Sequence, residues 1–457
     1  MAFTPKVITN PTNSASQPEG SAPQQSSADL SSMTDYQRSI RELSDQIVEA
    51  QRPIRILDAI QWDSTIQERF FASDCQELPA VDRAYYAKRP PGFDPGKKRR
   101  QFHTIERAIT RRLGQFNPVA QIMRRICREY QLVVRMLEAR GTPDFSVLSQ
   151  DLYGSASDVF HAGDPTLADL GVMMADTLGN MDPATFAQDD QETISGEQAV
   201  KILQQRLDEI FTKVGLNVRV LLSDGIIADA AAGSDYLKIR KEATFSEREL
   251  RVLEVHEGWV HLGTTLNGIN QPYCTFLSKG PPSATITQEG LAILMEIFAF
   301  VSHPNRLRRL SNRVRAVDQA EQGASFVDVF RFFRAEGYGE MESYNHAVRI
   351  FRGSTATDGP FTKDLSYNKG FILLYNFVRL AVRKGKLDRI PLLFCGKTML
   401  DDIGILAQLR DEGLIAAPRY LPPQFADLSA LTAWMCYSNF VSRLSMDRIE
   451  GDYAHLL

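Results

Sequence analysis

The chain has 457 residues, of which 43% are hydrophobic and 24% are charged, so it is long enough for two or three domains with well-filled cores. Its 52 basic and 56 acidic side chains give a formal net charge of −4. Proteins that bind nucleic acids or anionic membranes usually have a clear excess of positive charge, and this chain has none. The five cysteines are scattered, without a C-x-x-C pair, and indicate a reducing compartment, for which the cytoplasm is the best fit.

The first 34 residues differ in composition from the rest of the chain. They are rich in Ser, Pro, Gln and Asn and lack the charged and apolar regions of a secretory signal, so residues 1–34 are predicted to be a disordered tail. The longest apolar runs, such as residues 291–301, are short and contain Glu, which argues against a transmembrane helix. We therefore expect neither a membrane nor a nucleic acid as a partner.

Residues 35–194 form a predicted N-terminal helical region. Apolar residues recur at spacings of three and four near its start, with a break at Pro53. Further helices are predicted at residues 104–113 and 118–139. The basic run KKRR at residues 97–100 is expected in a solvated loop rather than in a nucleic-acid site. The periodicity is lost at about 180–194, which indicates a loop or a domain junction.

The second region, residues 195–457, is predicted to begin with a helix and a small sheet. Ser195 and Gln198 have the spacing of a capping box, which predicts a helix from there to residue 214. Segments rich in Val, Ile and Tyr, separated by Asp-Gly and Gly-Ser, then indicate two or three short strands at about 216–241.

Helices follow the predicted sheet to near the end of the chain. Ser246 and Glu249 have the spacing of a second capping box, which predicts a helix at about 247–266. The later helices are predicted at residues 285–301, 304–321, 325–336, 340–351, 365–384 and 399–412. The expected fold class is therefore α+β and predominantly helical.

Two histidines on the predicted helix 247–266 flank a glutamate in an H-E-x-x-x-H pattern. On a regular α-helix His256 and His261 would point about 140° apart, whereas the histidines of H-E-x-x-H differ by only about 40°. A single π-turn would return both imidazoles to one side, and Gly258 within the spacing would ease that distortion. The spacing alone leaves open whether the two are metal ligands or ordinary core histidines.

A third ligand is available on the next predicted helix. Thr285 and Gln288 are expected to cap this helix, which would place Glu289 in its first turn. Catalytic zinc usually takes three protein ligands and keeps one position open for water. His256, His261 and Glu289 would form such a site if the two helices lie antiparallel.

These motifs carry a resemblance to a known family. The segments VHEGWVHLGTTLNGINQP, TQEGLAILMEIF and RIFRGSTATDGPFTKDLSYNKGF resemble the QEGLA-motif family, often described as flavohaemoglobin expression-modulating proteins. That family is similar to the microtubule-associated tyrosine carboxypeptidases, which are zinc metallopeptidases with an H-E-x-x-x-H motif. The resemblance implies a gluzincin-like metallopeptidase core within residues 195–457, with the small sheet beside the zinc-binding helices. It also implies Zn²⁺ ligands at His256, His261 and Glu289, with Glu257 as the catalytic acid/base.

A carboxypeptidase also needs a cation for the terminal carboxylate of its substrate. Arg352 and Lys363, in a Gly-rich polar loop, are the first choices, and Arg349 is a further candidate because arginine binds carboxylates through two parallel hydrogen bonds. Tyr367 is the candidate for stabilising the developing oxyanion. Glu296, seven residues after Glu289, could orient a histidine ligand through its second ring nitrogen. Taken singly, each of these is as readily a surface, capping or solvated residue.

Two further segments resemble a substrate-binding strand and a phosphate-binding loop. The predicted strand 236–240 could bind an extended substrate along its edge, with Lys238 or Arg240 nearby, or it could lie in the interior of the sheet. The sequence Gly396-Lys397-Thr398 resembles the end of a phosphate-binding loop, but Pro391 stands where the pattern requires its first glycine.

The predicted function is a zinc-dependent peptidase, most simply a carboxypeptidase that acts on the C-terminus of a peptide or protein. The alternative from another class is a non-catalytic regulatory or interaction protein with a structural metal or none, and an aminopeptidase or endopeptidase is the alternative among enzymes. The sequence determines neither the oligomeric state, the physiological substrate nor the preferred terminal residue.

Overall fold

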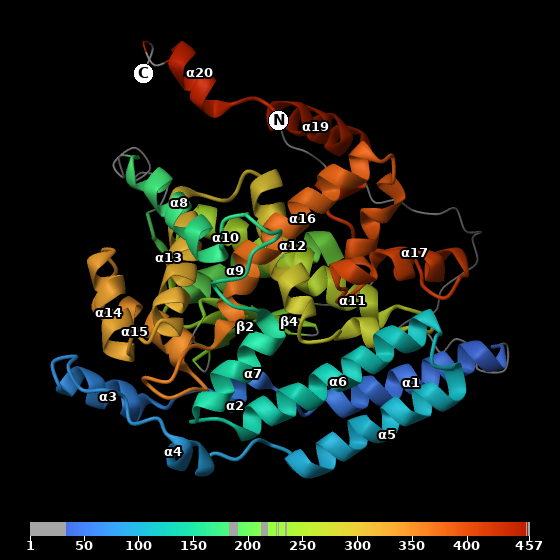
Figure 1. The fold of residues 1–457 in the computed structure, drawn as a ribbon, viewed down its shortest axis with the longest axis horizontal. Coiled ribbons are helices and arrows are strands. Elements are labelled where there is room, and N and C mark those ends of the chain that lie inside the picture. Colours follow the sequence, from blue (N-terminus) through green and yellow to red (C-terminus); the bar gives the residue numbers. More distant parts are fainter. Residues whose placement is uncertain are drawn as a thin grey trace.

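The computed structural model describes residues 33–181, 191–211, 218–224, 226, 228–233, 235–453 and 455. Nearly all of the predicted tail lies outside these residues, as do most of the predicted junction and the end of the helix predicted to reach residue 214. Helices make up most of the described chain, and a small sheet lies among them, so the predominantly helical α+β class is confirmed (Figure 1). None of the described helices has the length and apolarity needed to cross a lipid bilayer.

The first part of the chain is helical. Its elements are α1 (Asp35–Gln51), α2 (Ile56–Ala59), α3 (Ser64–Ala72), α4 (Arg83–Ala87), α5 (Pro95–Leu113), α6 (Pro118–Glu138), α7 (Pro143–Tyr153) and α8 (Leu167–Gly179). The long helices α1, α5 and α6 form a layer along one side of the molecule, whereas α8 lies away from them (Figure 1). The expectation of a loop at residues 97–100 was wrong, because Asp94 accepts a hydrogen bond from the Lys97 amide and begins α5 there. The sequence analysis also missed α3, α4, α7 and α8.

Two small sheets precede the helix that carries the histidines. The first joins β1 (Ile194–Ser195) to β5 (Thr244–Phe245), and α9 (Gly196–Phe211) follows β1. The second has the order β2–β4–β3, with β2 (Arg219–Ser223) parallel and β3 (Ala230–Ala232) antiparallel to β4 (Tyr236–Arg240). Two of the three capping boxes predicted from the sequence are present, at Ser195 and at Ser246.

The remaining chain is almost entirely helical and ends away from the first helical layer (Figure 1). Its helices are α10 (Glu247–Leu253), the π-helix η4 (Glu254–Leu262), α11 (Gly263–Ile269), α12 (Ala284–Phe298), α13 (Pro304–Glu321), α14 (Phe326–Ala335), α15 (Glu340–Phe351), α16 (Ser366–Arg383), α17 (Ile403–Asp411), α18 (Pro423–Ala426), α19 (Leu428–Val441) and α20 (Met446–Tyr453). Short 3₁₀ turns lie at η5 (Thr275–Ser278), η6 (Thr362–Leu365), η7 (Leu387–Arg389), η8 (Pro391–Phe394) and η9 (Leu400–Asp402).

The π-helix lies between two of the three hydrophobic cores. Val255 and Val260 pack into a large core that also contains residues of α1, α5 and α6, whereas Leu262 packs with α9 and the three-stranded sheet. Since the large core includes side chains from both sides of residue 195, the predicted regions 35–194 and 195–457 share buried surface. Their division into separate domains stays a prediction.

Helices α12 and α16 cross at two glycines, directly beside the predicted ligand Glu289 (Figure 1). A Cβ on Gly290 would overlap the backbone of Gly370, and a Cβ on Gly370 would overlap the carbonyl of Ile286. The absence of both side chains lets the helices approach closely, and this sets the position of Glu289 relative to α16.

Substituting Gly290→Ala should therefore lower the free energy of unfolding by about 3 kcal/mol or more, since backbone rather than a flexible side chain must move. Gly404→Ala on α17 is the control, because no atom lies within 4 Å of the added methyl group, and it should change stability by at most about 1 kcal/mol. Chemical denaturation of both variants measures the difference. Equal stabilities would show that the α12–α16 crossing is not tight at Gly290.

Candidate metal centre and active site

His256 and His261 project from the same side of the π-helix. The element runs over Glu254–Leu262 and continues without a break from α10 into α11. Its i→i+5 register brings the two imidazole rings to a centroid separation of 4.8 Å. The widened turn predicted from the five-residue spacing is thus present.

Local packing and side-chain hydroxyls accommodate the π-register. A Cβ on Gly258 would lie 2.6 Å from Leu207 Cδ2 of α9, so the glycine allows close packing at this point. The widened turn leaves carbonyl groups that need other donors. Thr264 Oγ1 donates to the Val260 carbonyl at 2.6 Å, and Thr265 Oγ1 donates to the His261 carbonyl at 2.8 Å.

Glu289 of α12 completes a group of three metal-binding side chains. Its Oε2 lies 3.3 Å from His256 Nε2 and 3.5 Å from His261 Nε2, and the three ligand atoms lie within 4.8 Å of one another. Glu289 Oε2 is buried without a hydrogen-bond partner, whereas Oε1 accepts a hydrogen bond from Lys363 at 3.1 Å. An unpaired carboxylate oxygen facing two imidazole nitrogens fits a His₂Glu metal site. Among the described residues this is the one such group.

The expected cap of α12 is not formed. The helix begins at Ala284, one residue before Thr285, and Ser283 at its N-cap makes no capping bond. Glu289 therefore lies beyond the first turn. Gln288 does not reach back to the helix start, because its side-chain oxygen accepts hydrogen bonds from Thr264 and Lys397 instead.

A second layer of charges orients His256. Glu296 is fully buried, and its Oε1 lies 2.7 Å from His256 Nδ1, the arrangement considered from the seven-residue spacing on α12. Arg306 of α13 donates to both oxygens of Glu296, at 3.0 and 3.3 Å. Burial opposes charge on both side chains, but their partners prevail. Arg306, together with His256, lowers the pKa of Glu296 to about 2, and Glu289, together with Glu296, raises the pKa of His256 to about 10. The surroundings therefore favour positive charge at this imidazole.

Glu257 lies beside the three ligands without belonging to them. Its Oε2 accepts a hydrogen bond from the Ala232 amide of β3 at 3.0 Å, and its Oε1 lies 4.0 Å from His256 Nε2. The small sheet thus holds this carboxylate at the edge of the site. Such an anchored carboxylate can exchange protons with a molecule that lies between it and the histidines.

A cavity of about 380 Å³ opens onto this group. Its inner lining includes His256, Glu257, Arg313, His346, Arg349 and Tyr367. The residues come from the π-helix and from α13, α15 and α16. One candidate metal ligand, the candidate acid/base and several cationic side chains therefore line one cavity.

The structure distributes the predicted cationic residues differently. Lys363 is bound to Glu289, and Arg352 is buried outside the cavity lining, with its guanidinium over the Phe361 ring. Arg349 does line the cavity, but its guanidinium forms a two-bond pair with Asp364 at 2.9 and 2.8 Å. Arg352 and Lys363 are thus poorly placed as the first choices for a substrate carboxylate.

Arg313 is the functional candidate that the sequence analysis missed. It lines the cavity, its guanidinium lies over the Tyr367 ring, and its Nε makes no hydrogen bond, with Asp364 Oδ2 3.8 Å away. Burial and the charge of Arg349 lower its pKa to about 10, which leaves it protonated at neutral pH. A signal was available, since Arg306, Arg309 and Arg313 share one face of α13 by their spacing of three and four.

The proposal that β4 binds substrate along its edge is wrong. β4 is the central strand, paired with β2 on one side and β3 on the other, so its backbone groups are already used. Lys238 lies over the ring of Tyr236 and outside the cavity lining. Arg240 does line the cavity, where it pairs with Asp229 at 2.5 Å.

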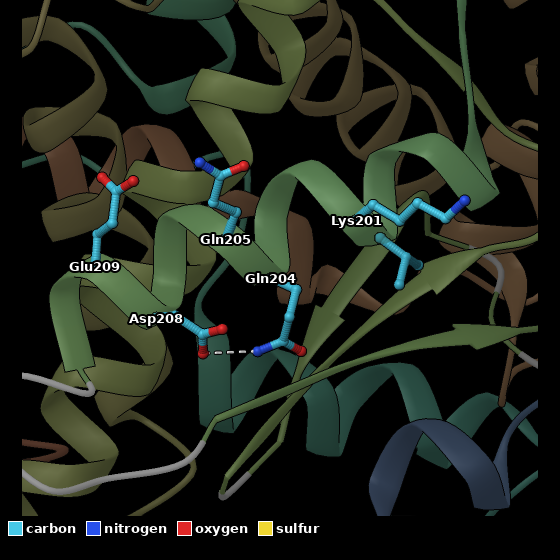
Figure 2. A pocket seen from close by; sticks show the side chains of 6 residues that line it. Lys201, Gln204, Gln205, Asp208 and Glu209 are labelled. Atoms are coloured by element: carbon cyan, nitrogen blue, oxygen red, sulfur yellow. Dashed lines mark hydrogen bonds between the residues drawn. The ribbon is translucent and has the colours of Figure 1, made fainter.

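Another hollow lies on the outer face of α9, and Figure 2 shows its lining. The side chains are Val200, Lys201, Gln204, Gln205, Asp208 and Glu209, with Gln204 hydrogen-bonded to Asp208 at 2.9 Å. All six come from one helix, so this hollow is a polar helix face and brings no reactive groups together from different elements. The candidate active site is the cavity at the π-helix.

One comparison with known proteins gives a match. The family model for microtubule-associated tyrosine carboxypeptidases matches residues 68–443, which is most of the chain and includes the whole candidate site. Curated protein sequences yield no match.

His346 provides a test of the electrostatics of the cavity that is independent of any metal. Its ring stacks on Phe333 at 4.7 Å, is 6% exposed, and has no hydrogen bond at either nitrogen. Burial, together with the charges of Arg313 and Arg309, lowers the pKa of His346 from 6.5 to about 4, although Glu342 Oε1, 3.8 Å from Nε2, favours the protonated ring.

Between pH 6.5 and 4 the unfolded chain therefore binds a proton at residue 346 that the folded chain does not, so the protein loses stability as the pH falls. Replacing His346→Phe should remove about 2 kcal/mol of the stability loss between pH 7 and pH 5. Denaturation at both pH values measures this effect, and His103→Phe, on the exposed face of α5, is the matched control. An unchanged pH dependence in His346→Phe would show that the buried ring is protonated.

Proposed function

The chain belongs to the microtubule-associated tyrosine carboxypeptidase family, and from this premise we propose that it is a zinc-dependent carboxypeptidase acting on the C-terminus of a peptide or protein. The observation that carries the proposal is the convergence of two imidazoles and a carboxylate oxygen without a hydrogen bond, beside a cavity that His256, Glu257 and several arginines line. On this proposal the π-helix, α12 and the small sheet form a gluzincin-like core. The cytoplasm remains the predicted location.

His256, His261 and Glu289 would hold the Zn²⁺ ion. Bound there, the ion would supply Lewis-acid polarisation of the scissile carbonyl and a lowered pKa of water. Lys363 binds Oε1 of Glu289, which leaves Oε2 as the single oxygen directed at the histidines. Glu296 binds the Nδ1 side of His256 and so directs Nε2 toward the same point.

Glu257 is the proposed acid/base. Its carboxylate stands next to the metal ligands and is oriented by the Ala232 amide, so it can take a proton from the attacking water and pass it to the leaving amine. The Ala232 amide also keeps Oε2 occupied, which leaves Oε1 as the oxygen nearer His256. The same side chain thus serves both proton transfers without moving out of the site.

The charge of the site favours an anionic ligand. The cations at its inner end are Arg306, Arg313, Arg349, Arg352 and Lys363, and the carboxylates are Glu257, Glu289, Glu296 and Asp364. A divalent cation added to this set would leave a clear excess of positive charge. A substrate carboxylate offsets such an excess, whereas an internal peptide segment does not.

Arg313 is the proposed partner of the terminal carboxylate. Asp364 already occupies the fork of Arg349 and so holds it beside Arg313. Arg313 Nε makes no hydrogen bond, and both the Arg313 guanidinium and the His256 ring lie against Tyr367, the latter at 6.2 Å between ring centroids. Tyr367 remains the proposed donor to the oxyanion, because its hydroxyl belongs to the same wall.

The family name supplies the proposed terminal residue. Tyrosine is the residue named for the family, and the cavity beyond Arg313 is lined by Asn345 and the uncharged His346, which suit a neutral side chain with a hydrogen-bonding group. The strand available to align an extended substrate is β3, at the edge of the sheet next to Glu257.

Replacing Glu257→Gln should reduce kcat on a peptide with a free C-terminal tyrosine by about 1,000-fold or more, since the amide cannot accept the proton. The zinc content should stay at that of the unmodified protein, because Glu257 is not among the proposed ligands. Glu254→Gln, on the same π-helix but outside the cavity, is the control and should keep its activity. Full activity in Glu257→Gln would show that Glu257 is not the acid/base. Absence of zinc from the unmodified protein would contradict the proposal that it is a metallopeptidase.

Replacing Arg313→Met should lower kcat/KM for peptides with a free C-terminus by about 100-fold, the value of two charge-assisted hydrogen bonds at roughly 1.5 kcal/mol each. Peptides amidated at the C-terminus should be cleaved poorly by both proteins, because they lack the carboxylate. Arg308→Met, on the same helix but outside the cavity, should resemble the unmodified protein. If Arg352→Met rather than Arg313→Met lowers kcat/KM, the substrate carboxylate binds at Arg352.

A further inference from the structure

The segment Gly396-Lys397-Thr398 follows η8 and packs against the helices that carry the proposed ligands. The Lys397 amide donates to the Leu277 carbonyl at 2.7 Å, which fastens the segment to η5. A Cβ on Gly396 would lie 2.6 Å from both the carbonyl oxygen and the Cβ of Leu277. Only glycine therefore fits where the chain turns inward, and this turn carries Lys397 into the protein.

The ammonium group of Lys397 joins two helices at the metal centre. Its Nζ donates to the carbonyl of His261 at 3.0 Å and to Gln288 Oε1 at 2.9 Å. Thr264 Oγ1 donates to the same Gln288 oxygen at 2.8 Å, and both Thr264 and Gln288 are buried. His261 is itself a proposed ligand, and Gln288 immediately precedes the proposed ligand Glu289.

We propose that Lys397 is a positioning residue for the metal centre, which sets the distance between the π-helix and α12 and thereby the approach of His261 to Glu289. The inference rests on the proposed function in one respect, that the three ligands bind a metal ion. The ammonium suits the task because it has three donors and no acceptor, so it can bridge two oxygens whose other side-chain donors are threonine hydroxyls.

The π-register explains why a donor is needed at this point. The His261 carbonyl accepts hydrogen bonds from Thr265 Oγ1 as well as from Lys397, so side chains contribute where the widened turn loosens the backbone ladder. A methyl or methylene group in place of the ammonium would leave the His261 carbonyl and the Gln288 oxygen short of a buried donor. The carbonyl belongs to His261 itself, and Gln288 directly precedes Glu289. A shift of either oxygen would therefore displace a proposed ligand.

The test compares Lys397→Met and Lys397→Arg with the unmodified full-length chain. Each protein is stripped of metal with a chelator, and its zinc dissociation constant is measured by competition with a chromophoric chelator. The visible absorption of the Co²⁺-loaded proteins then reports the ligand geometry. Lys384→Met, at an exposed lysine at the end of α16, is the matched control.

We expect Lys397→Met to bind zinc about 10- to 100-fold more weakly than the unmodified chain and to alter the Co²⁺ spectrum. Lys397→Arg, which keeps a charged donor, should recover part of the affinity, and Lys384→Met should behave as the unmodified chain. Should Lys397→Met not fold, Thr264→Val retains the shape of the network and removes one donor, with an expected weakening of about threefold.

Unchanged zinc affinity and an unchanged Co²⁺ spectrum in Lys397→Met or Thr264→Val would overturn the positioning role while leaving the proposed peptidase intact. Lost thermal stability with unaltered metal affinity would also overturn it, since Lys397 would then be structural only. An unmodified protein that binds neither metal would overturn the proposed function together with this inference.

Discussion

The widened i→i+5 register between Glu254 and Leu262 is the constraint on which the candidate site depends. With a regular α-helical turn, His256 and His261 would face different sides, and Glu289 could approach only one of them. The π-register removes that conflict at the cost of backbone hydrogen bonds, and Thr264, Thr265 and Lys397 supply substitutes from side chains. A helix that needs so much support from its surroundings is maintained by tertiary packing rather than by its own propensity.

The remaining ligand depends on a different kind of constraint, the closeness of two helices. Glu289 stands next to Gly290, where α12 meets Gly370 of α16 with no side chain between them. From the opposite direction, Lys363 and Arg306 bind the carboxylates of Glu289 and Glu296. Close backbone packing at the α12–α16 crossing and ion pairs to the carboxylates therefore both limit the movement of the proposed ligands.

Much of this arrangement could be predicted from the sequence, because the signals were local. The capping box at Ser246 marks the start of the helix, and two histidines five residues apart share a side only across a π-turn. The seven-residue interval places Glu296 on the same face of α12 as Glu289. The errors arise where a tertiary contact overrides a local pattern. Gln288 had the spacing of a cap but bonds to Thr264 and Lys397. The sequence left open whether the strand carrying Lys238 lies at an edge or in the interior, and pairing with β2 and β3 makes it central. Arg313 lies in a run of arginines that reads as a solvated face, and only the packing of α13 turns it inward.

Two buried cations beside Tyr367, the expected Lys363 and the unexpected Arg313, show why residue type alone cannot assign a substrate-binding role. Lys363 and Arg313 are both buried beside Tyr367, but the first is matched by Glu289 and the second retains an unbonded Nε. A buried cation already paired with a carboxylate gains little from a second anion, whereas a buried cation left short of partners carries a desolvation cost that an incoming carboxylate can offset. Near the cavity, the Nε atoms of Arg240, Arg313 and Arg352 have no hydrogen bond. Arg240 is bound to Asp229 and Arg352 lies outside the cavity lining, so Arg313 is the candidate for binding an anion at the cavity wall.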